Sequence, residues 1–371
     1  MSDVQSLSPA LARDQQARGA RLIDIRDAHE RLAGHADGAF GITQADLLGV
    51  PAEHLPDRDA AIVLICQSGM RSMQTARALH DLGYTRVASV EGGTVQWRAE
   101  GLPIVVPEGD TDFAERYARH LRLPEIGVQG QKALEAASVL LVGAGGLGSP
   151  IAWYLAAAGV GTLRIVDFDV VERSNLQRQI VHTDARIGMP KVDSARIALE
   201  ALNPRVRIEA INATVTIENI DALLDGIDVA IDGADNFDVR YVLNDACVRH
   251  AVPMVHGAVH RFEGQISVFD AGRQRGAAPC YRCLFPEAPP REFAPNCSDV
   301  GVLGVLPGLV GLVQATETLK LLLGIGTSLA GRLLHVDALS MRFRETRLAP
   351  DPHCPMCTPD TPVTGYNSVR A

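Results

Sequence analysis

The sequence predicts an α/β protein of two domains, each built on a mostly parallel β-sheet. Short apolar runs rich in Val, Ile and Leu alternate with helical patterns on both sides of a segment rich in Pro and acidic residues. A glycine-rich turn joins one such run to an Ala-rich helical stretch, which is typical of a β-α-β nucleotide-binding unit. We therefore expect a first domain at 1–106, a linker at 107–112 and a second domain at 113–371.

The composition excludes several classes of protein. The 371 residues are 47% hydrophobic with a mean hydropathy of +0.07, which is typical of globular protein. A net charge of −9 disfavours binding to nucleic acid. The N-terminus lacks a basic start and an apolar run, so we expect no signal peptide and a cytoplasmic location. The apolar stretch 300–323 is interrupted by Pro307, Gln314, Glu317 and Lys320, so we expect a buried helix and no membrane span.

The first domain is predicted from three apolar strands and one helix. A short strand begins at Arg21, and a second, at 60–65, delivers Cys66 to its C-terminal end. A helical pattern follows over 72–82, and another strand is expected at 87–90. Cys66 therefore lies in a tight loop between a strand and a helix.

Cys66 is the candidate nucleophile of this domain. A cysteine at a helix start lies among backbone N–H donors and at the positive end of a helix dipole, and both stabilise a thiolate. Arg71 adds a second positive partner at the end of the same loop. The alternative is a buried structural cysteine without reactivity.

The first hundred residues resemble the rhodanese-like sulfurtransferases. The resemblance is carried by Asp24-Ile25-Arg26, Gly34-His35 with Gly38-Ala39, the loop from Cys66 to Arg71, and Gly92-Gly93 with Trp97. It implies that Cys66 carries a persulfide cradled by loop amides. The loop has four residues between Cys66 and Arg71, one fewer than in phosphatases of this fold, which favours sulfur over phosphate.

The second domain is organised around a glycine loop. A strand at 139–142 leads into Gly143, Gly145 and Gly146, whose missing side chains let the backbone approach a phosphate. A helix is expected at 150–158, and a second strand, at 162–166, ends at Asp167. An acidic residue at this spacing can bond a ribose hydroxyl, but the pattern alone does not distinguish ATP from NAD or FAD.

Polar and cationic residues beyond Asp167 favour a triphosphate. Asn175, Arg178 and Lys191 follow the second strand. A hydride-transfer enzyme needs a nicotinamide pocket at this place, whereas an enzyme that releases pyrophosphate from a triphosphate needs cations there to bind the phosphates. Asp235 and Asn236 follow another apolar strand, so Asp235 can hold Mg²⁺ and Asn236 can bond the nucleotide. The alternatives are surface charges for Arg178 and Lys191 and a helix cap for Asp235.

Seven cysteines, without an export signal, favour metal or redox chemistry over disulfides. Two Cys-x-x-Cys pairs predict a four-thiolate zinc site, which we expect to be structural because no ligand position stays open: Cys280, Cys283, Cys354 and Cys357. Cys297 lies between the pairs in a Pro-rich loop and is a candidate second nucleophile, with a non-essential exposed cysteine as the alternative. Cys247 is expected to pack in the core.

The segment from about residue 113 to Cys357 resembles the adenylyltransferases that activate ubiquitin-like sulfur carriers. These include the molybdopterin-synthase adenylyltransferase and its thiamine-biosynthesis relative, kin of ubiquitin-activating enzymes. The resemblance is carried by Gly143-Ala-Gly-Gly-Leu-Gly148, Asp167-Phe-Asp169, Ser174-Asn-Leu-Gln-Arg-Gln179, Pro190-Lys191, Asp235-Asn236, Gly264-Gln265 and the four paired cysteines. It implies a Rossmann-like domain that uses ATP.

The resemblance also implies roles for single residues. Gly146 and Asp167 would contact adenosine, Asn175, Arg178 and Lys191 would bind phosphates, Asp235 would hold Mg²⁺, and Arg119 would reach into the site of the partner subunit in a homodimer. The substrate would be a small ubiquitin-like carrier with a C-terminal Gly-Gly, whose terminal carboxylate attacks the α-phosphate of ATP.

The fusion of both domains predicts a second step. We expect a persulfide on Cys66 to attack the acyl-adenylate, and Cys297 to release the thiocarboxylate. A sulfur donor such as a cysteine desulfurase would load Cys66. Relatives with a fused sulfurtransferase usually carry it after the adenylating domain, whereas here it comes first. Two alternatives remain: a non-catalytic carrier-binding scaffold and an NAD-dependent oxidoreductase.

Overall fold

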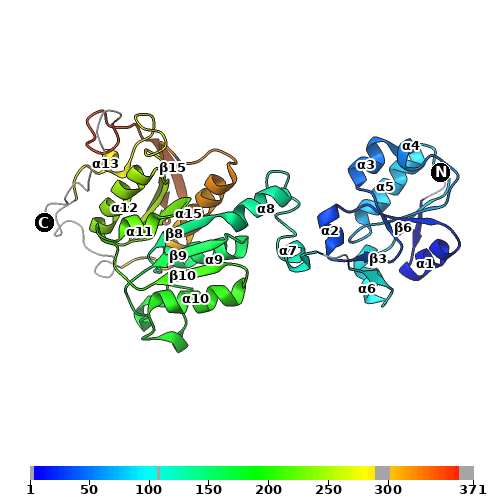
Figure 1. Ribbon diagram of the computed structural model, residues 1–371, viewed down its shortest axis with the longest axis horizontal. Helices are drawn as coiled ribbons and strands as arrows, with labels where there is room; N and C mark the ends of the chain where they lie inside the picture. The colour runs from blue at the N-terminus through cyan, green and yellow to red at the C-terminus, as the bar shows by residue number, and fades with distance from the viewer. Residues whose placement is uncertain (1–3, 107–108, 289–300, 359–371) are drawn as a thin grey trace. The chain divides into compact units, whose positions relative to one another are not determined.

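The computed structural model describes residues 4–106, 109–288 and 301–358 (Figure 1). Its internal contacts divide the chain into two compact units, Met1–Val128 and Gln129–Ala371. The chain is an α/β protein, and each unit contains a sheet with parallel strands.

The first unit is built on a five-stranded sheet in the order β1-β6-β5-β2-β4, and all its pairings are parallel. The strands are β1 (Gln5–Leu7), β2 (Arg21–Asp24), β4 (Phe40–Gly41), β5 (Ile62–Ile65) and β6 (Val87–Val90). Strands β5 and β6 are buried at every position, as continuous apolar runs in a doubly covered parallel sheet must be. The strand predicted at 87–90 is confirmed, and the one predicted at 60–65 begins two residues later.

Short helices and one small ribbon complete the first unit. The helices are α1 (Pro9–Ala17), α2 (Ala28–Leu32), α3 (Gln44–Gly49), α4 (Pro51–His54), α5 (Met70–Asp81), α6 (Gly93–Ala99) and α7 (Thr111–Arg116). Strands β3 (His35–Ala36) and β7 (Ile104–Val105) pair antiparallel. Helix α5 begins at Met70, before the predicted start at Ser72, because Gly69 in the left-handed conformation is its N-cap.

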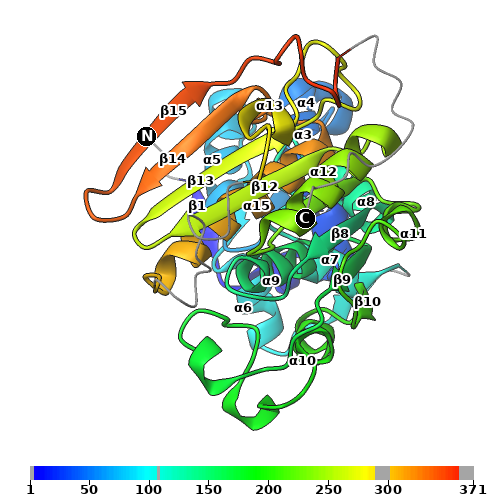
Figure 2. The same cartoon turned by 90° about the vertical axis from the view of Figure 1, so that its left-hand side faces the viewer.

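The second unit contains an eight-stranded sheet in the order β10-β9-β8-β11-β12-β13-β14-β15. The strands are β8 (Ser138–Val142), β9 (Thr162–Val166), β10 (Arg207–Ile211), β11 (Val229–Asp232), β12 (Met254–His260), β13 (Glu263–Phe269), β14 (Arg332–Asp337) and β15 (Arg342–Arg347). The pairings from β10 to β12 are parallel, and those from β12 to β15 are antiparallel. Figure 2 shows these last four strands as neighbouring arrows. The antiparallel part is not predicted from the sequence.

Helices and short turns of 3₁₀ helix flank this sheet. They are α8 (Gly127–Ala136), α9 (Gly148–Ala158), α10 (Lys191–Leu202), α11 (Ile220–Leu224), α12 (Phe237–His250), α13 (Tyr281–Leu284), α15 (Val305–Leu323), η1 (Arg173–Asn175) and η2 (Asp184–Arg186). The largest apolar cluster of the second unit joins residues of β8, β9, α9, α10 and α15. The carboxyl ends of β8, β9 and β11 therefore open onto loops above a rigid core.

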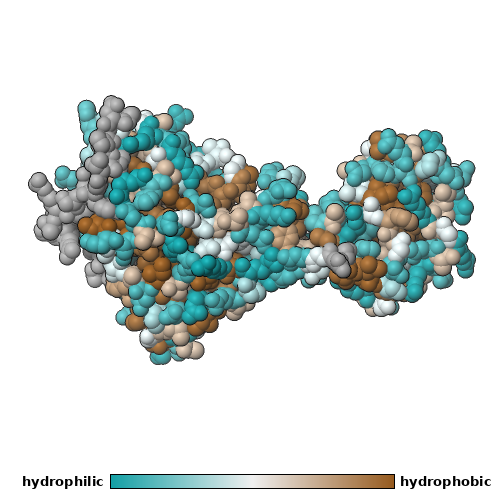
Figure 3. All heavy atoms as spheres, in the orientation of Figure 1, coloured by the Kyte–Doolittle hydropathy of each residue, from teal (hydrophilic) through white to brown (hydrophobic). Residues whose placement is uncertain are grey.

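Helix α15 is a core helix of this unit. Within the described ranges it is the one helix long and apolar enough to cross a membrane. Its buried positions include Gln314, whose side-chain amide donates to the carbonyls of Asp232 and Val255 at 2.8 and 3.2 Å. These bonds and its place in the apolar cluster account for its composition, in agreement with the expected buried helix. In Figure 3 hydrophobic residues lie scattered among hydrophilic ones on the visible face of the second unit.

Candidate functional sites

The Cys66 sulfur lies in a cradle of donors at the start of α5. It accepts hydrogen bonds from the Gly69 N–H at 3.2 Å and from the Ser72 N–H and hydroxyl, both at 3.4 Å. The side chain is 1% exposed. Loop amides and a helix N-terminus thus surround a sulfur atom, which is an environment that stabilises negative charge on it.

Glycines make this cradle possible. Gly69 has φ +85°, and a Cβ there would lie 3.0 Å from the Val90 carbonyl oxygen. Gly93 has φ +58°, and a Cβ there would lie only 2.2 Å from the Cys66 carbonyl oxygen. The amides of Thr94 and Val95 donate to the carbonyls of Cys66 and Gln67, so the start of α6 clamps the loop from the side opposite α5.

Arg71 forms an ion pair with Glu30, a residue that was not singled out from the sequence. Its guanidinium donates to both carboxylate oxygens of Glu30 at 2.9 and 2.7 Å, and Arg122 of the same unit donates to one of them at 2.6 Å. Burial opposes ionisation of Glu30, but these two arginines outweigh it and lower its pKa to about 2. Glu30 lies three residues after Asp27 in the spacing of a capping box, and nothing in that spacing indicates a place beside Cys66.

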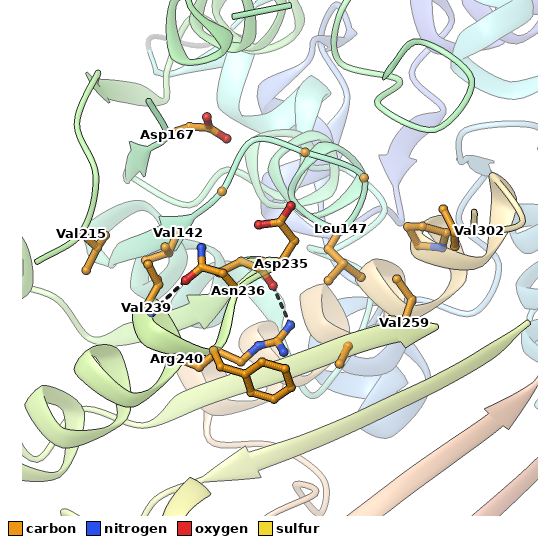
Figure 4. Close-up of a pocket in the computed structure, with 18 of the residues that line it drawn as sticks. Val142, Leu147, Asp167, Val215, Asp235, Asn236, Val239, Arg240, Val259 and Val302 are labelled. Carbon is orange, nitrogen blue, oxygen red and sulfur yellow. Dashed lines mark hydrogen bonds between the residues drawn. The ribbon is translucent and has the colours of Figure 1, made fainter. Parts of the chain in front are cut away.

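The second unit holds a cavity of about 460 Å³ at the carboxyl ends of its parallel strands (Figure 4). It is lined by both loops that the sequence singles out, with Gly143, Gly145, Gly146, Asp167, Arg178, Lys191, Asp235 and Asn236 all on its surface. Ligands bind in this position in open α/β sheets.

The glycine loop is held through the peptide groups of Ala144. The Ala144 N–H donates to Asp167 Oδ2 at 2.8 Å, and the Ala144 carbonyl accepts from His182 Nε2 at 3.0 Å. Burial lowers the pKa of His182 to about 4, so the ring is neutral, and its Nδ1 accepts from the Ser194 hydroxyl at 2.9 Å. Burial also raises the pKa of Asp167.

The glycine loop abuts the loop after β11. Gly143 has φ +96°, and a Cβ there would lie 2.7 Å from the Gly233 carbonyl oxygen. Only a glycine fits both the backbone angle and this approach.

Two cations face the cavity. Lys191, at the start of α10, is 6% exposed, and its Nζ donates to Asp169 Oδ2 at 2.8 Å. Arg178 donates to the Ser174 carbonyl at 3.3 Å from a half-buried position. Both therefore place positive charge on the cavity surface, with Lys191 in an ion pair with Asp169, whose side chain is half exposed.

Asp235 and Asn236 follow β11 and have different tasks. Asn236 Oδ1 accepts from the Val239 N–H at 3.0 Å and caps α12, so the cap is Asn236 and not Asp235. The Asp235 side chain is exposed on the cavity surface and points into the open space in Figure 4. This leaves the Asp235 carboxylate available to a metal ion or a ligand.

Two of the expected site residues, Asn175 and Arg119, do not line this cavity, and a third cannot be placed. Asn175 is half-buried at the end of η1, donates to Ser174 Oγ at 3.3 Å and does not line the cavity. Arg119 is exposed and belongs to the first unit. Cys297 lies outside the described residues.

Several lining residues have no role predicted from the sequence. Phe168, Asp169 and Gln179 belong to motifs that carry the family resemblance. The others come from β12 to β14, from helices α12, α13 and α15, and from the segments after β10 and before α15: Thr214, Arg240, His260, Glu263, Tyr281, Val302, Pro307 and His335. Most stand far from the glycine loop in sequence, and only the fold brings them there. Gln179 carries a signal, because it ends the motif that begins at Ser174.

The four paired cysteines form one cluster. All four sulfur atoms lie within 4.8 Å of one another, with Cys280–Cys354 at 3.6 Å and Cys283–Cys357 at 3.3 Å. Four thiols at this spacing fit the tetrahedral ligand set that zinc takes in structural sites. The cluster joins α13 to the segment after β15 across about seventy residues of sequence.

Two protein families match this chain. Residues 117–356 match the ThiF family, and residues 8–100 match the rhodanese-like domain. Together the two matches cover the Cys66 loop, the residues that line the cavity and three of the four paired cysteines, since Cys357 lies one position beyond the ThiF match.

Curated relatives match about two thirds of the chain. The SAMP-activating enzyme E1 of Haloferax volcanii is 50% identical over 248 residues, which is 67% of this chain and 90% of the relative. The probable adenylyltransferase/sulfurtransferase MoeZ of Mycobacterium tuberculosis is 47% identical over 258 residues, 69% of this chain and 66% of the relative. The adenylyltransferase and sulfurtransferase MOCS3 of Drosophila sechellia is 47% identical over 254 residues, 68% of this chain but only 55% of the relative.

Solved structures share the fold of about two thirds of the chain at low identity. The crystal structure of E. coli MccB has a TM-score of 0.57 at 18% identity, covering 72% of this chain and 80% of that one. That of PaaA has a TM-score of 0.55 at 21% identity, covering 65% and 75%. The chain belongs to the ThiF family and carries a rhodanese-like domain ahead of its nucleotide-binding unit.

Proposed function

We propose that this protein activates the C-terminal glycine of a small ubiquitin-like sulfur carrier by adenylation and then converts it to a thiocarboxylate. The observation that carries the proposal is the presence on one chain of a phosphate-type cavity and a cradled cysteine. The names of the relatives, adenylyltransferase and sulfurtransferase, pair the same two activities. We propose functional domains at 1–106 and 113–371 with a linker at 107–112; the two family matches, 8–100 and 117–356, fall within these domains.

In the first step, ATP occupies the cavity of the second unit. Lys191 and Arg178 bind its phosphates, and Asp235 holds Mg²⁺, which would supply further positive charge there. The carrier carboxylate attacks the α-phosphorus, the bond to pyrophosphate breaks, and an acyl-adenylate remains. Charge grows on the phosphoryl oxygens, so fixed cations and loop amides accelerate the step by electrostatic stabilisation.

In the second step, the terminal sulfur of a persulfide on Cys66 attacks the acyl carbon and AMP leaves. The loop amides and the Ser72 hydroxyl stabilise the sulfur anion before attack. A second thiol, for which we propose Cys297, then attacks the Cys66 sulfur and releases the thiocarboxylate. The disulfide that forms is reduced by a cellular dithiol.

Further components follow from the same assignment. We propose Zn²⁺ at the four-cysteine cluster as a structural ion, with all four ligand positions taken by thiolates. We also propose a homodimer in which Arg119 reaches the partner's cavity, a cysteine desulfurase as the sulfur source, and a cytoplasmic location. An NAD-dependent oxidoreductase and a non-catalytic scaffold fit less well, because Lys191, Arg178 and Asp235 all face the cavity.

ATP–pyrophosphate exchange tests the first step. Purified candidate carriers are supplied one at a time, each with and without the terminal Gly-Gly. Exchange that needs one carrier and its tail supports the proposal and identifies the pathway. Tight ATP binding without exchange for any carrier would favour the scaffold.

A further inference from the structure

The turn that displays Asp235 is held through the two peptide groups that flank Ala234. The Ala234 N–H donates to Asp232 Oδ1 at 3.0 Å, and the Ala234 carbonyl accepts from Arg240 at 2.6 Å. Figure 4 shows this second bond as a dashed line below Asp235. Asp232 and Arg240 also bond each other at 3.0 Å, so the turn is clamped by a closed buried pair.

The clamp is completed by an aromatic side chain from another part of the chain. Tyr281 is 1% exposed and, like Arg240, lines the cavity. The Tyr281 ring lies 5.2 Å from the ring of His256, whose Nδ1 donates to Asp232 at 2.7 Å. Tyr281 therefore supports the buried pair through His256.

Tyr281 stands between Cys280 and Cys283, in the first knuckle of the cysteine cluster (residues 280–283). Its N–H donates to Asn244 Oδ1 at 2.8 Å. The other residue between the cysteines, Arg282, donates to both oxygens of Asp245 at 2.7 and 2.8 Å. Both partners belong to α12, the helix that Asn236 caps at the cavity. The knuckle is thus fixed to the element that begins at the nucleotide site.

We propose that Tyr281 and Arg240 are positioning residues that hold the 233–236 turn, so that the first knuckle sets how tightly the cavity binds a magnesium-bound nucleotide. The inference rests on the proposed adenylation site. It gives the cysteine cluster a task beyond folding, because a shift of the knuckle passes through Tyr281 to His256 and Asp232, and then to Ala234 and Asp235.

Calorimetric titration of the full-length protein with ATP, with and without Mg²⁺, tests the inference. Tyr281→Leu removes the aromatic ring that packs on His256 and leaves all four cysteines in place. We expect the dissociation constant of Mg–ATP to rise about fivefold, or about 1 kcal/mol, while that of metal-free ATP changes much less. A general loss of structure would weaken both alike. Tyr154→Leu, on the exposed face of α9, is the matched control and is expected to bind as the parent does.

A second variant changes Arg282, the other residue between Cys280 and Cys283. Arg282→Lys breaks the two-pronged contact with Asp245 and leaves all four cysteines in place. We expect the same selective weakening of Mg–ATP binding, with the zinc content and unfolding midpoint of the parent. Arg240 itself is a poorer target, because its removal leaves a buried unpaired Asp232.

The outcomes separate the inference from the proposed function. Unchanged Mg–ATP affinity in both variants would overturn the inference, as would weakening only in step with lost zinc and lost stability. A parent protein that fails to bind ATP, or binds it equally with and without Mg²⁺, would instead contradict the proposed adenylation site.

Discussion

Single side chains anchor the nucleotide cavity by gripping peptide groups. Ala144 is held by Asp167 and His182, and Ala234 is held by Asp232 and Arg240. In each loop an acid at a strand end takes the N–H, and a donor from another element takes the carbonyl. Buried, fully paired polar groups of this kind fix a loop in one conformation.

Asp235 is the residue on which adenylation depends most directly in this account. Asp235→Asn is expected to lower ATP–pyrophosphate exchange by about a hundredfold or more, because the metal loses its carboxylate ligand. Asp238→Asn, an exposed substitution three residues on, is the control and is expected to leave exchange near the parent rate. Equal rates for parent and Asp235→Asn would remove Asp235 from the mechanism.

Glu30 makes the stability of the first unit depend on acid. Its pKa falls from 4.5 to about 2 on folding, so its charge stabilises the fold above about pH 4.5, and this stabilisation is lost between about pH 4.5 and 2. Glu30→Gln is expected to lower the unfolding midpoint at neutral pH and to flatten its decline over that acidic range.

The fluorescence of Trp97, buried in the first unit, reports this transition alone in a Trp153→Phe background. Glu53→Gln, exposed on α4, provides the control. Parallel pH curves for Glu30→Gln and the parent would show that Glu30 contributes nothing in acid.

At the scale of elements, the Cys66 cradle is made by two helix starts that meet one strand end. The start of α5 supplies the hydrogen-bond donors to the Cys66 sulfur, and the start of α6 supports the loop through the N–H groups of Thr94 and Val95. This packing needs the close approach that Gly93 permits.

Gly93→Ala and Gly101→Ala separate backbone strain from that close approach. Both have positive φ, but a Cβ at Gly101 meets nothing within 4 Å. We expect Gly101→Ala to destabilise the protein by about 1 kcal/mol, from strain alone, and Gly93→Ala by about 3 kcal/mol or more. Denaturant titration measures both values. Equal losses would mean that the loop shifts freely to accept a methyl group.

Elements with strong local patterns could be predicted from the sequence, and those defined by long-range pairing could not. The strands at 87–90 and 162–166 are continuous apolar runs, and both predictions are confirmed. Strands β12 and β13 contain His256, Gly257 and Gly264, which break the pattern, and their pairing is set by neighbours distant in sequence.

The same division applies to the candidate sites. Glycines, strand-end acids and paired cysteines carry their chemistry in local spacing, and they do meet in one cavity and one cluster. Glu30, His182 and Tyr281 carry no such signal, because their partners lie dozens of residues away. Asn175 lies in a recognised motif, yet its side chain does not line the cavity.

At the scale of the whole molecule, each unit has its own core and its own candidate site. The cysteine cluster belongs to the second unit alone. Loss of the metal should therefore disable one activity and spare the other.

Cys354→Ser tests this independence. We expect loss of bound zinc, a lower unfolding midpoint for the second unit and loss of ATP binding, because a structural zinc site contributes directly to folding. Loading of sulfur onto Cys66 should persist. Cys247→Ala, a buried change outside the cluster, should retain zinc. Retained zinc and full ATP affinity in Cys354→Ser would contradict the assignment.

The central claim is that two sites on one chain act in sequence on one carrier. The mass of the intact carrier, measured after incubation with ATP, Mg²⁺ and a sulfur donor, tests it most directly. The parent should yield carrier thiocarboxylate, Cys66→Ala should stop at carrier adenylate, and Asp235→Asn should leave the carrier unmodified. Thiocarboxylate formed by Cys66→Ala, or no adenylate in that variant, would contradict this division of labour.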